Sequence, residues 1–296
     1  MLITLAYAIC VDETQLKIGP AKPPAGKTRA ERYLLVACTE LYTAFLLGDR
    51  SLDTFKKFIF ADLDGSMIVH DRYKAYDSTE LIDLGGRFEH QFCAAHILRD
   101  LQGAAETYPD ANWPTQIADA LRALIHLANT AREQGRDQIP HLAREEHLTW
   151  LRRGVAVGLA ETLHHGNRPG ERKARLLLEF LRDRREEMLR FAVDLNVPPT
   201  SNQAERDLRP SKICQNISGR LASEDRAADR YAILGYLSTV AKHGRNKISI
   251  SRTPCSAAPG CPCCPPQADT ASLHTRTRLH TATAACLNDH LLNVCM

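Results

Sequence analysis

The sequence predicts an α/β protein with a mixed sheet that is interrupted by a large helical block. Short apolar, β-rich runs alternate with helical periodicity up to about residue 111, and the pattern is then wholly helical to about residue 195. With 296 residues, 44% of them hydrophobic, the chain is long enough for one large or two modest domains with a real core.

Three apolar, β-rich runs open the chain, at residues 3–12, 33–40 and 42–48. The first run ends at Asp12. The second and third are separated by little more than Leu41, which indicates a hairpin or a single bent strand.

One amphipathic helix and two further strands are expected next. Apolar residues recur at helical spacing over residues 51–63. A strand over residues 66–71 ends at Asp71, and a further short strand over residues 88–95 precedes a helix that starts at about His96. The carboxyl ends of strands are where α/β folds usually place their sites, so Asp12 and Asp71 are candidates for a site.

The helical block is clearest over residues 171–195, where an apolar stripe recurs at three- and four-residue steps. A last helix is expected from Ser223 to about His243, with acidic residues early and basic residues late, as the helix dipole favours. Beyond about residue 247 neither helix nor strand periodicity continues, which is typical of a disordered tail.

A short capped helix is predicted within residues 198–212, PPTSNQAERDLRPSK. The paired prolines block a helix upstream, Thr200 is placed to cap the helix, and Pro210 is expected to end it.

Helical spacing puts Asn202, Glu205 and Arg209 on one face of that helix. A carboxylate beside an amide and a guanidinium can hold a metal ion and a phosphate together. An ordinary solvated helix with an internal ion pair fits this segment equally well.

The net charge of only +3 excludes few classes of function. Residues 200–247 are locally basic, with nine Lys/Arg against five Asp/Glu, which mildly indicates a polyanionic partner. No apolar run reaches about 18 residues, so no membrane span is predicted. The N-terminus lacks a basic region and a cleavage pattern, and it resembles a buried strand more than a signal peptide.

Four of the ten cysteines are scattered through apolar segments, where free cysteine behaves as a small hydrophobe. The other six lie at or beyond Cys255, and this distribution favours a reducing, cytosolic setting. Zinc binding by the cluster of Cys255, Cys261, Cys263 and Cys264 is disfavoured, because adjacent cysteines rarely serve one tetrahedral site.

Three acidic residues stand out by context: Asp12, Asp71 and Glu205. Two strand-end aspartates and a helix-borne glutamate can bind two divalent cations, roughly 3.5–4 Å apart, at a phosphodiester. Spacing alone indicates a metal site only weakly, because a strand-end aspartate is more often a turn or cap residue.

Four segments together resemble the catalytic domain of a DDE transposase of the insertion-sequence-66 family of bacterial mobile elements. They are VDET, VHDRYKAY, CAAHILRDL and the PPTSNQAERDLRPSK block with its downstream SGR and YLSTVAKHGRN. The resemblance covers about residues 8–247, and its last block argues against a different RNase H-like nuclease.

The resemblance implies an RNase H-like mixed sheet with the helical insertion between the second Asp strand and the Glu helix. We expect the first part of this core over residues 1–111, the insertion over residues 112–195 and the rest of the core over residues 196–247. Residues 248–296 would then be the disordered tail.

The implied activity is metal-dependent DNA cleavage and strand transfer. Asp12, Asp71 and Glu205 would be the catalytic triad and would hold two Mg²⁺ or Mn²⁺ ions. The implied partners are DNA, as terminal inverted repeats and target, further copies in a synaptic complex, and accessory proteins of the same element. The implied location is the bacterial cytoplasm, in association with the nucleoid.

Basic and amide residues around Glu205 would contact DNA phosphates or steady that carboxylate: Asn202, Arg206, Arg209 and Lys212. For Arg206 a surface salt bridge is the alternative.

The Cys93–His96 pair matches the family's cysteine–histidine pair after the second Asp. A packed cysteine and a histidine that positions the site are favoured over half a zinc site. His70 either orients a phosphate or a carboxylate or is merely packed.

Two further features have modest expected roles. Glu13 is expected to point away from the Asp12 side as a solvated turn residue. Tyr73 and Tyr76 can stack on a frayed base, but packing is favoured for both.

This chain departs from the family pattern at both ends. Relatives carry DNA-binding helices before the first Asp and a leucine-containing helix after the HGRN-like sequence. These departures keep a second hypothesis open, an inactive transposase remnant that binds DNA or intact transposase without catalysis.

Overall fold

Five strands form a mixed sheet in the order β3-β2-β1-β4-β5. The computed structural model describes residues 2–19, 32–78, 81, 87–163, 168–221 and 223–246. The strands are β1 (Ala8–Leu16), β2 (Arg32–Cys38), β3 (Thr43–Gly48), β4 (Asp64–His70) and β5 (Arg87–Phe92). Eight α-helices lie within the described residues: α1 (Leu52–Phe58), α3 (Ala94–Thr107), α4 (Trp113–Glu133), α5 (His141–Glu161), α6 (Pro169–Asp183), α7 (Arg185–Leu189), α8 (Asn202–Ser218) and α9 (Glu224–Lys242).

The chain divides into two compact units. The first comprises residues 1–12 and 55–206, and the second comprises residues 13–54 and 207–296. Strand β1 and helix α8 each contribute residues to both units.

In the first unit, β4 pairs in parallel with both β1 and β5. Ile9, Ile68 and Val69 are fully buried, because the middle strands of a covered parallel sheet present both faces to apolar neighbours.

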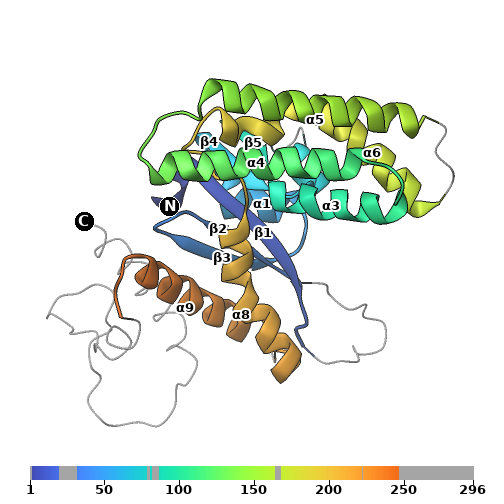
Figure 1. Ribbon diagram of the computed structural model, residues 1–296. Coiled ribbons are helices and arrows are strands. Elements are labelled where there is room, and N and C mark those ends of the chain that lie inside the picture. The colour runs from blue at the N-terminus through green and yellow to red at the C-terminus, as the bar shows by residue number, and fades with distance from the viewer. Residues whose placement is uncertain are drawn as a thin grey trace, which may run out of the picture. The chain divides into compact units, whose positions relative to one another are not determined.

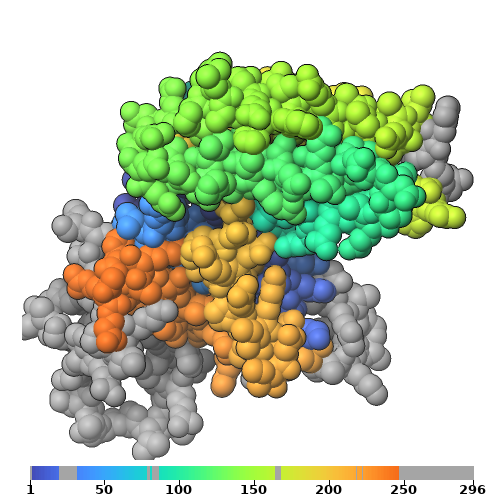
Figure 2. All heavy atoms as spheres, viewed as in Figure 1, coloured from blue at the N-terminus to red at the C-terminus, as the bar shows by residue number. Residues whose placement is uncertain are grey.

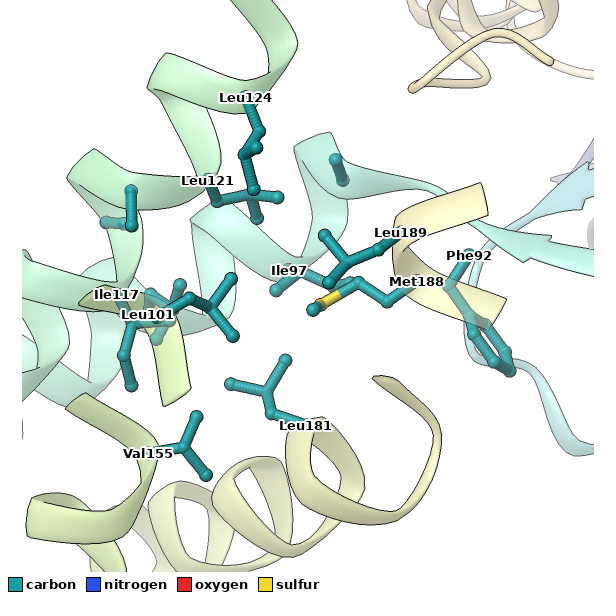
Figure 3. Close-up of a cluster of buried hydrophobic side chains, with 14 of the residues drawn as sticks. Phe92, Ile97, Leu101, Ile117, Leu121, Leu124, Val155, Leu181, Met188 and Leu189 are labelled. Atoms are coloured by element: carbon teal, nitrogen blue, oxygen red, sulfur yellow. The ribbon is translucent and has the colours of Figure 1, made fainter. Parts of the chain in front are cut away.

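The helices of the first unit enclose a large apolar core, part of which is drawn in Figure 3. Ile117, Leu121 and Leu124 recur along α4 at three- and four-residue steps and are all fully buried. Side chains from α3, α5, α6 and α7 meet them, including Leu101, Val155, Leu181, Met188 and Leu189. Helices α4 and α5 lie side by side in Figure 1, and Figure 2 shows them forming one continuous surface.

In the second unit, β2 and β3 form an antiparallel hairpin on which α9 packs. The α9 side chain of Tyr231 lies against Phe45, and a Cβ at Gly235 would lie 3.3 Å from the carbonyl oxygen of Thr43. A side chain larger than glycine at this position would therefore require helix and strand to separate by a few tenths of an ångström.

A buried ion pair joins the elements of the second unit. The Lys242 ammonium donates to the carbonyl oxygens of Thr39 and Tyr42, at 2.9 and 3.0 Å, and lies 3.2 Å from Asp207. The Asp207 carboxylate also accepts hydrogen bonds from the hydroxyls of Thr43 and Ser238. Every proton of the Lys242 ammonium thus has an acceptor, as a buried cation requires.

Most predicted elements are present, with three corrections. The first strand starts at Ala8 rather than residue 3, because Leu2–Leu5 form a 3₁₀ helix, and it continues past Asp12 to Leu16. The helix expected over residues 51–63 is divided into α1 and a 3₁₀ turn, Phe60–Asp62.

The third correction concerns Pro210, which does not end its helix, since α8 continues to Ser218. Pro210 is exposed, so solvent can replace the hydrogen bond that its missing N–H would give to the carbonyl of Arg206.

The expected tail, residues 248–296, lies outside the described residues together with Cys255, Cys261, Cys263 and Cys264. Within the part that the structure describes, no helix is both long and apolar enough to span a membrane.

Candidate active site

Asp12 and Asp71 occupy equivalent places on neighbouring parallel strands. The register pairs Ala8 with Met67 and Cys10 with Val69, and its continuation by two residues sets Asp12 beside Asp71. Adjacent strands lie about 4.8 Å apart, and paired residues of parallel strands point to the same face. Both aspartates are partly exposed, and we infer that their carboxylates share one face of the sheet, Asp71 just after the end of β4 and Asp12 within β1, which continues to Leu16.

Asp71 is held at both its carbonyl and its carboxylate. Its carbonyl oxygen accepts a hydrogen bond from Nδ1 of His70, and its Oδ1 accepts one from the backbone N–H of Tyr73 at 2.9 Å. The second bond closes an Asx-type turn, which directs the chain away from the sheet.

Glu205 lies in the first turn of α8 with two basic side chains nearby. Its Oε1 lies 3.5 Å from Nε2 of His96 and 3.9 Å from Nη2 of Arg99. The Glu205 side chain is 29% exposed, so the carboxylate is reachable from solvent yet partly desolvated.

The start of α3 holds the segment that leads into α8. The backbone N–H of Ala94 donates to the carbonyl of Pro199 at 2.9 Å. The Cys93 sulfur, which is 1% exposed, accepts the N–H of Ser201 at 3.2 Å. The Cys10 thiol lies 3.8 Å from the carbonyl oxygen of Thr200. Glu205 is thereby placed by contacts from β1 and from the end of β5.

Residues 188–197, upstream of that segment, are anchored by two polar side chains. Gln91, which is fully buried, donates to the carbonyl of Met188 at 2.8 Å and accepts the N–H of Phe191 at 3.1 Å. Arg132 of α4 donates to the carbonyls of Leu195 and Val197, at 2.6 Å each. The helical block therefore contributes directly to the path of the chain toward Glu205.

His96 and Cys93 shift each other's pKa in opposite directions. Contact with the Cys93 thiol raises the pKa of His96 above its ordinary value, burial opposes this, and the charges of Asp71 and Glu205 add to the rise. Burial opposes ionisation of Cys93, but its contacts with His96 and Ser201 outweigh burial and lower the pKa of the thiol. His96 therefore favours its charged imidazolium form, and the charges of Asp71 and Glu205 act on it.

The exposed face of α8 carries Asn202, Arg206, Arg209 and Lys212. Ala204, Leu208 and Ser211 are buried on the opposite face, as helical spacing requires. Among the described residues, Arg206, Arg209 and Lys212 form no ion pair, so the salt bridge considered for Arg206 is not observed.

Three side chains differ from expectation or decide between alternatives. Glu13 is not solvated, because its side chain is 3% exposed and pairs with Arg50. His70 is fully buried, which excludes direct contact with a phosphate. Tyr76 is 1% exposed and packs against Phe55, whereas Tyr73 is partly exposed.

Sequence reasoning missed several residues that build this site: Gln91, Arg99, Arg132 and His90, the partner of His70. Gln91 and His90 carried no clear signal, because both lie in β5, RFEHQF, where four of the six residues are polar. Arg99 and Arg132 carried none, because an arginine on a helix is ordinarily solvated.

Within the described part of the chain, no three His, Cys, Asp or Glu side chains come together as a metal-binding group. The candidate donors of Asp12, Asp71 and Glu205 are carboxylate oxygens, which are the ligands that Mg²⁺ and Mn²⁺ prefer.

Comparison with known proteins gives one family and no individual relative. Neither the curated proteins nor the solved structures contain a significant match to this chain. The sequence model described as "Transposase IS66 family" matches residues 2–229, about three quarters of the chain. The matched stretch contains Asp12, Asp71, Glu205 and the whole of α8. The chain therefore belongs to the IS66 family of transposases.

Proposed function

We propose that this chain is a DDE-type catalytic domain that cleaves DNA and transfers the cut strand, with Asp12, Asp71 and Glu205 as its acidic triad. One observation carries the proposal. Continued by two residues, the parallel register of β1 and β4 sets Asp12 beside Asp71, and His96 lies 3.5 Å from Glu205 while the charge of Asp71 also raises its pKa. These observations support one shared site for three carboxylates that are distant in sequence.

The carboxylates fit a pair of hard divalent cations, Mg²⁺ or Mn²⁺. Asp12 and Asp71 would hold one ion between them, and Glu205 would complete the second site. Bound ions of this kind activate an attacking water or 3′-hydroxyl and stabilise the leaving oxygen.

The chain's own residues would orient the reactants. The two hydrogen bonds to Asp71 fix its carboxylate before DNA arrives, so little reorganisation is needed on binding. His96 and Arg99 place positive charge beside Glu205, where they limit repulsion between the carboxylate and a phosphodiester.

DNA is the proposed partner, as terminal inverted repeat and as target. Arg206, Arg209 and Lys212 on the exposed face of α8 would take phosphates of the backbone, since they are exposed cations beside Glu205 on the same helix. A synaptic homo-oligomer that brings two element ends together would complete the reaction.

The test is nicking and strand transfer on an oligonucleotide that carries the element's terminal repeat, in Mg²⁺ or Mn²⁺. Asp71→Asn should abolish both reactions. Asp64→Asn is the matched control, because Asp64 starts the same strand β4, is exposed and pairs only with Arg87 in the described structure.

Equal nicking by Asp71→Asn and the parent chain would overturn the triad assignment. If the parent chain binds intact transposase of the family yet nicks nothing in any divalent metal, the non-catalytic remnant replaces this proposal.

A further inference from the structure

Two histidines of neighbouring strands, His70 and His90, are hydrogen-bonded to one another in the first unit. His70 ends β4 and His90 lies in β5, and their Nε2 and Nδ1 atoms are 2.9 Å apart. The other nitrogen of His70, Nδ1, contacts the carbonyl oxygen of Asp71. A continuous chain of hydrogen bonds therefore runs from His90 through His70 to Asp71.

The acceptor at the end of this chain determines the position of each proton. A carbonyl oxygen can only accept, so Nδ1 of His70 must carry hydrogen. In a neutral imidazole the other nitrogen is then an acceptor, and Nδ1 of His90 must donate to it. Both rings thus have a defined tautomer.

Packing holds the His70 ring in this orientation. Its side chain is fully buried, with the Tyr76 ring 4.4 Å and the Phe92 ring 5.1 Å from its centroid. Burial, together with the neighbouring His90, lowers the pKa of His70 to about 3, which agrees with a neutral ring.

We propose that His90 and His70 are positioning residues that fix the peptide carbonyl of Asp71 and thereby the direction of its carboxylate. This inference rests on the proposed function, in which Asp71 is a member of the triad. His70 holds the carbonyl while the Tyr73 N–H holds the carboxylate, so Asp71 is restrained where the chain leaves the sheet. Such support around a ligand residue commonly governs how well it holds a metal ion.

Two substitutions at His70 separate positioning from packing. His70→Leu removes both hydrogen bonds. His70→Asn keeps an N–H donor close to the place of Nδ1 but loses the contact with His90. Phe92→Leu is the matched control, because it weakens packing around the same ring and leaves both hydrogen bonds in place.

The first measurement is Mn²⁺ binding to the full-length, DNA-free chain, followed by the electron paramagnetic resonance of free Mn²⁺. We expect His70→Leu to weaken binding about 10- to 100-fold, as loss of support around metal ligands does. His70→Asn should recover most of that loss, and His90→Leu should weaken binding to a smaller extent. Phe92→Leu should lower the melting temperature but leave Mn²⁺ binding near that of the parent.

The second measurement is the tautomer of His70, read from long-range ¹H–¹⁵N correlation spectra of the unsubstituted protein. Protonation at Nδ1 supports the chain of hydrogen bonds, and protonation at Nε2 overturns it. Folded His70→Leu that binds Mn²⁺ as the parent does also overturns the positioning role. If Asp71→Asn leaves Mn²⁺ binding unchanged, the proposed metal site fails instead, and the tautomer still tests the hydrogen bonds.

Discussion

The Nε2 atom of His96 lies 3.5 Å from the Oε1 atom of Glu205. His96 is on α3, directly after β5, and Glu205 is on α8, so this contact joins two segments separated by the whole helical block. It indicates that the block returns the chain to the strand ends.

Replacement of His96 by Gln should give a stability difference that depends on pH. The pKa of His96 is raised in the folded protein, by the Cys93 contact first and by Asp71 and Glu205 as well. A raised pKa stabilises the fold fully below the unfolded value of about 6.5, and the contribution disappears as pH rises through the folded value. In urea unfolding with EDTA present, the difference in the free energy of unfolding between the parent and His96→Gln should therefore be larger at about pH 5.5 than at about pH 8.5.

His126→Gln serves as the control for this pH series, since His126 lies on α4 and forms no ion pair in the described structure. Its difference from the parent should be small. A His96→Gln difference that grows toward alkaline pH would contradict the expected sign.

Removal of positive charge from α8 should weaken DNA binding equally for all sequences. Arg206→Ala, Arg209→Ala and Lys212→Ala should each reduce the slope of log affinity against log salt by about 1, because each releases one fewer counterion. Fluorescence anisotropy with labelled duplexes over a salt series measures this slope.

Arg153→Ala is the matched control for the salt series, because Arg153 is an exposed arginine on α5. It should leave the slope unchanged. If the three α8 substitutions behave like Arg153→Ala, α8 does not contact phosphates.

Local pattern was enough to predict the strands and most of the helices. Apolar runs located β2, β3 and β4, and the short gap at Leu41 indicated the hairpin that joins β2 and β3. The expected strand end also marked Asp71, which directly follows β4, but it was wrong for Asp12, because β1 continues to Leu16. These features depend on residues that are neighbours in the chain, so they can be predicted without the tertiary structure.

Contacts between distant segments could not be predicted in the same way. Glu13 appeared to be a turn residue because nothing nearby in sequence reveals Arg50 as its partner. His90 lies on a partly exposed strand, and only the pairing of β4 with β5 brings it to His70. Pro210 appeared to end a helix because its missing N–H leaves a carbonyl unpaired. Whether solvent can satisfy that carbonyl depends on exposure, which is a property of the tertiary structure.

Loss of the Lys242 ammonium should strongly destabilise the second unit. The side chains of Lys242 and Asp207 are 10% and 9% exposed, so Lys242→Met leaves a buried carboxylate and two carbonyls short of a donor. Breaking a buried pair of this kind costs about 3–5 kcal/mol in the free energy of unfolding. Urea denaturation followed by circular dichroism measures the change.

Arg32→Met provides the comparison, because Arg32 and Glu224 form an ion pair with side chains 30% and 51% exposed. Its cost should be below about 1 kcal/mol. The double variant Asp207→Leu with Lys242→Met should be more stable than Lys242→Met alone, since no buried charge is then left unpaired. Equal losses in the free energy of unfolding for Lys242→Met and Arg32→Met would show that the buried ion pair stabilises the fold no more than the exposed one.

Two helical glycines of the first unit should respond to alanine in opposite directions. A Cβ at Gly158 of α5 would lie 2.7 Å from Leu178 and 2.8 Å from Trp113, so Gly158→Ala forces apart well-packed side chains. Overpacking of this kind costs about 1–3 kcal/mol. A Cβ at Gly103 of α3 would meet nothing within 4 Å, and alanine there restricts the unfolded chain and should stabilise by about 0.5–1 kcal/mol. Thermal unfolding of the two variants measures both changes in stability. A stabilised Gly158→Ala would contradict the close packing of α5 against α4 and α6.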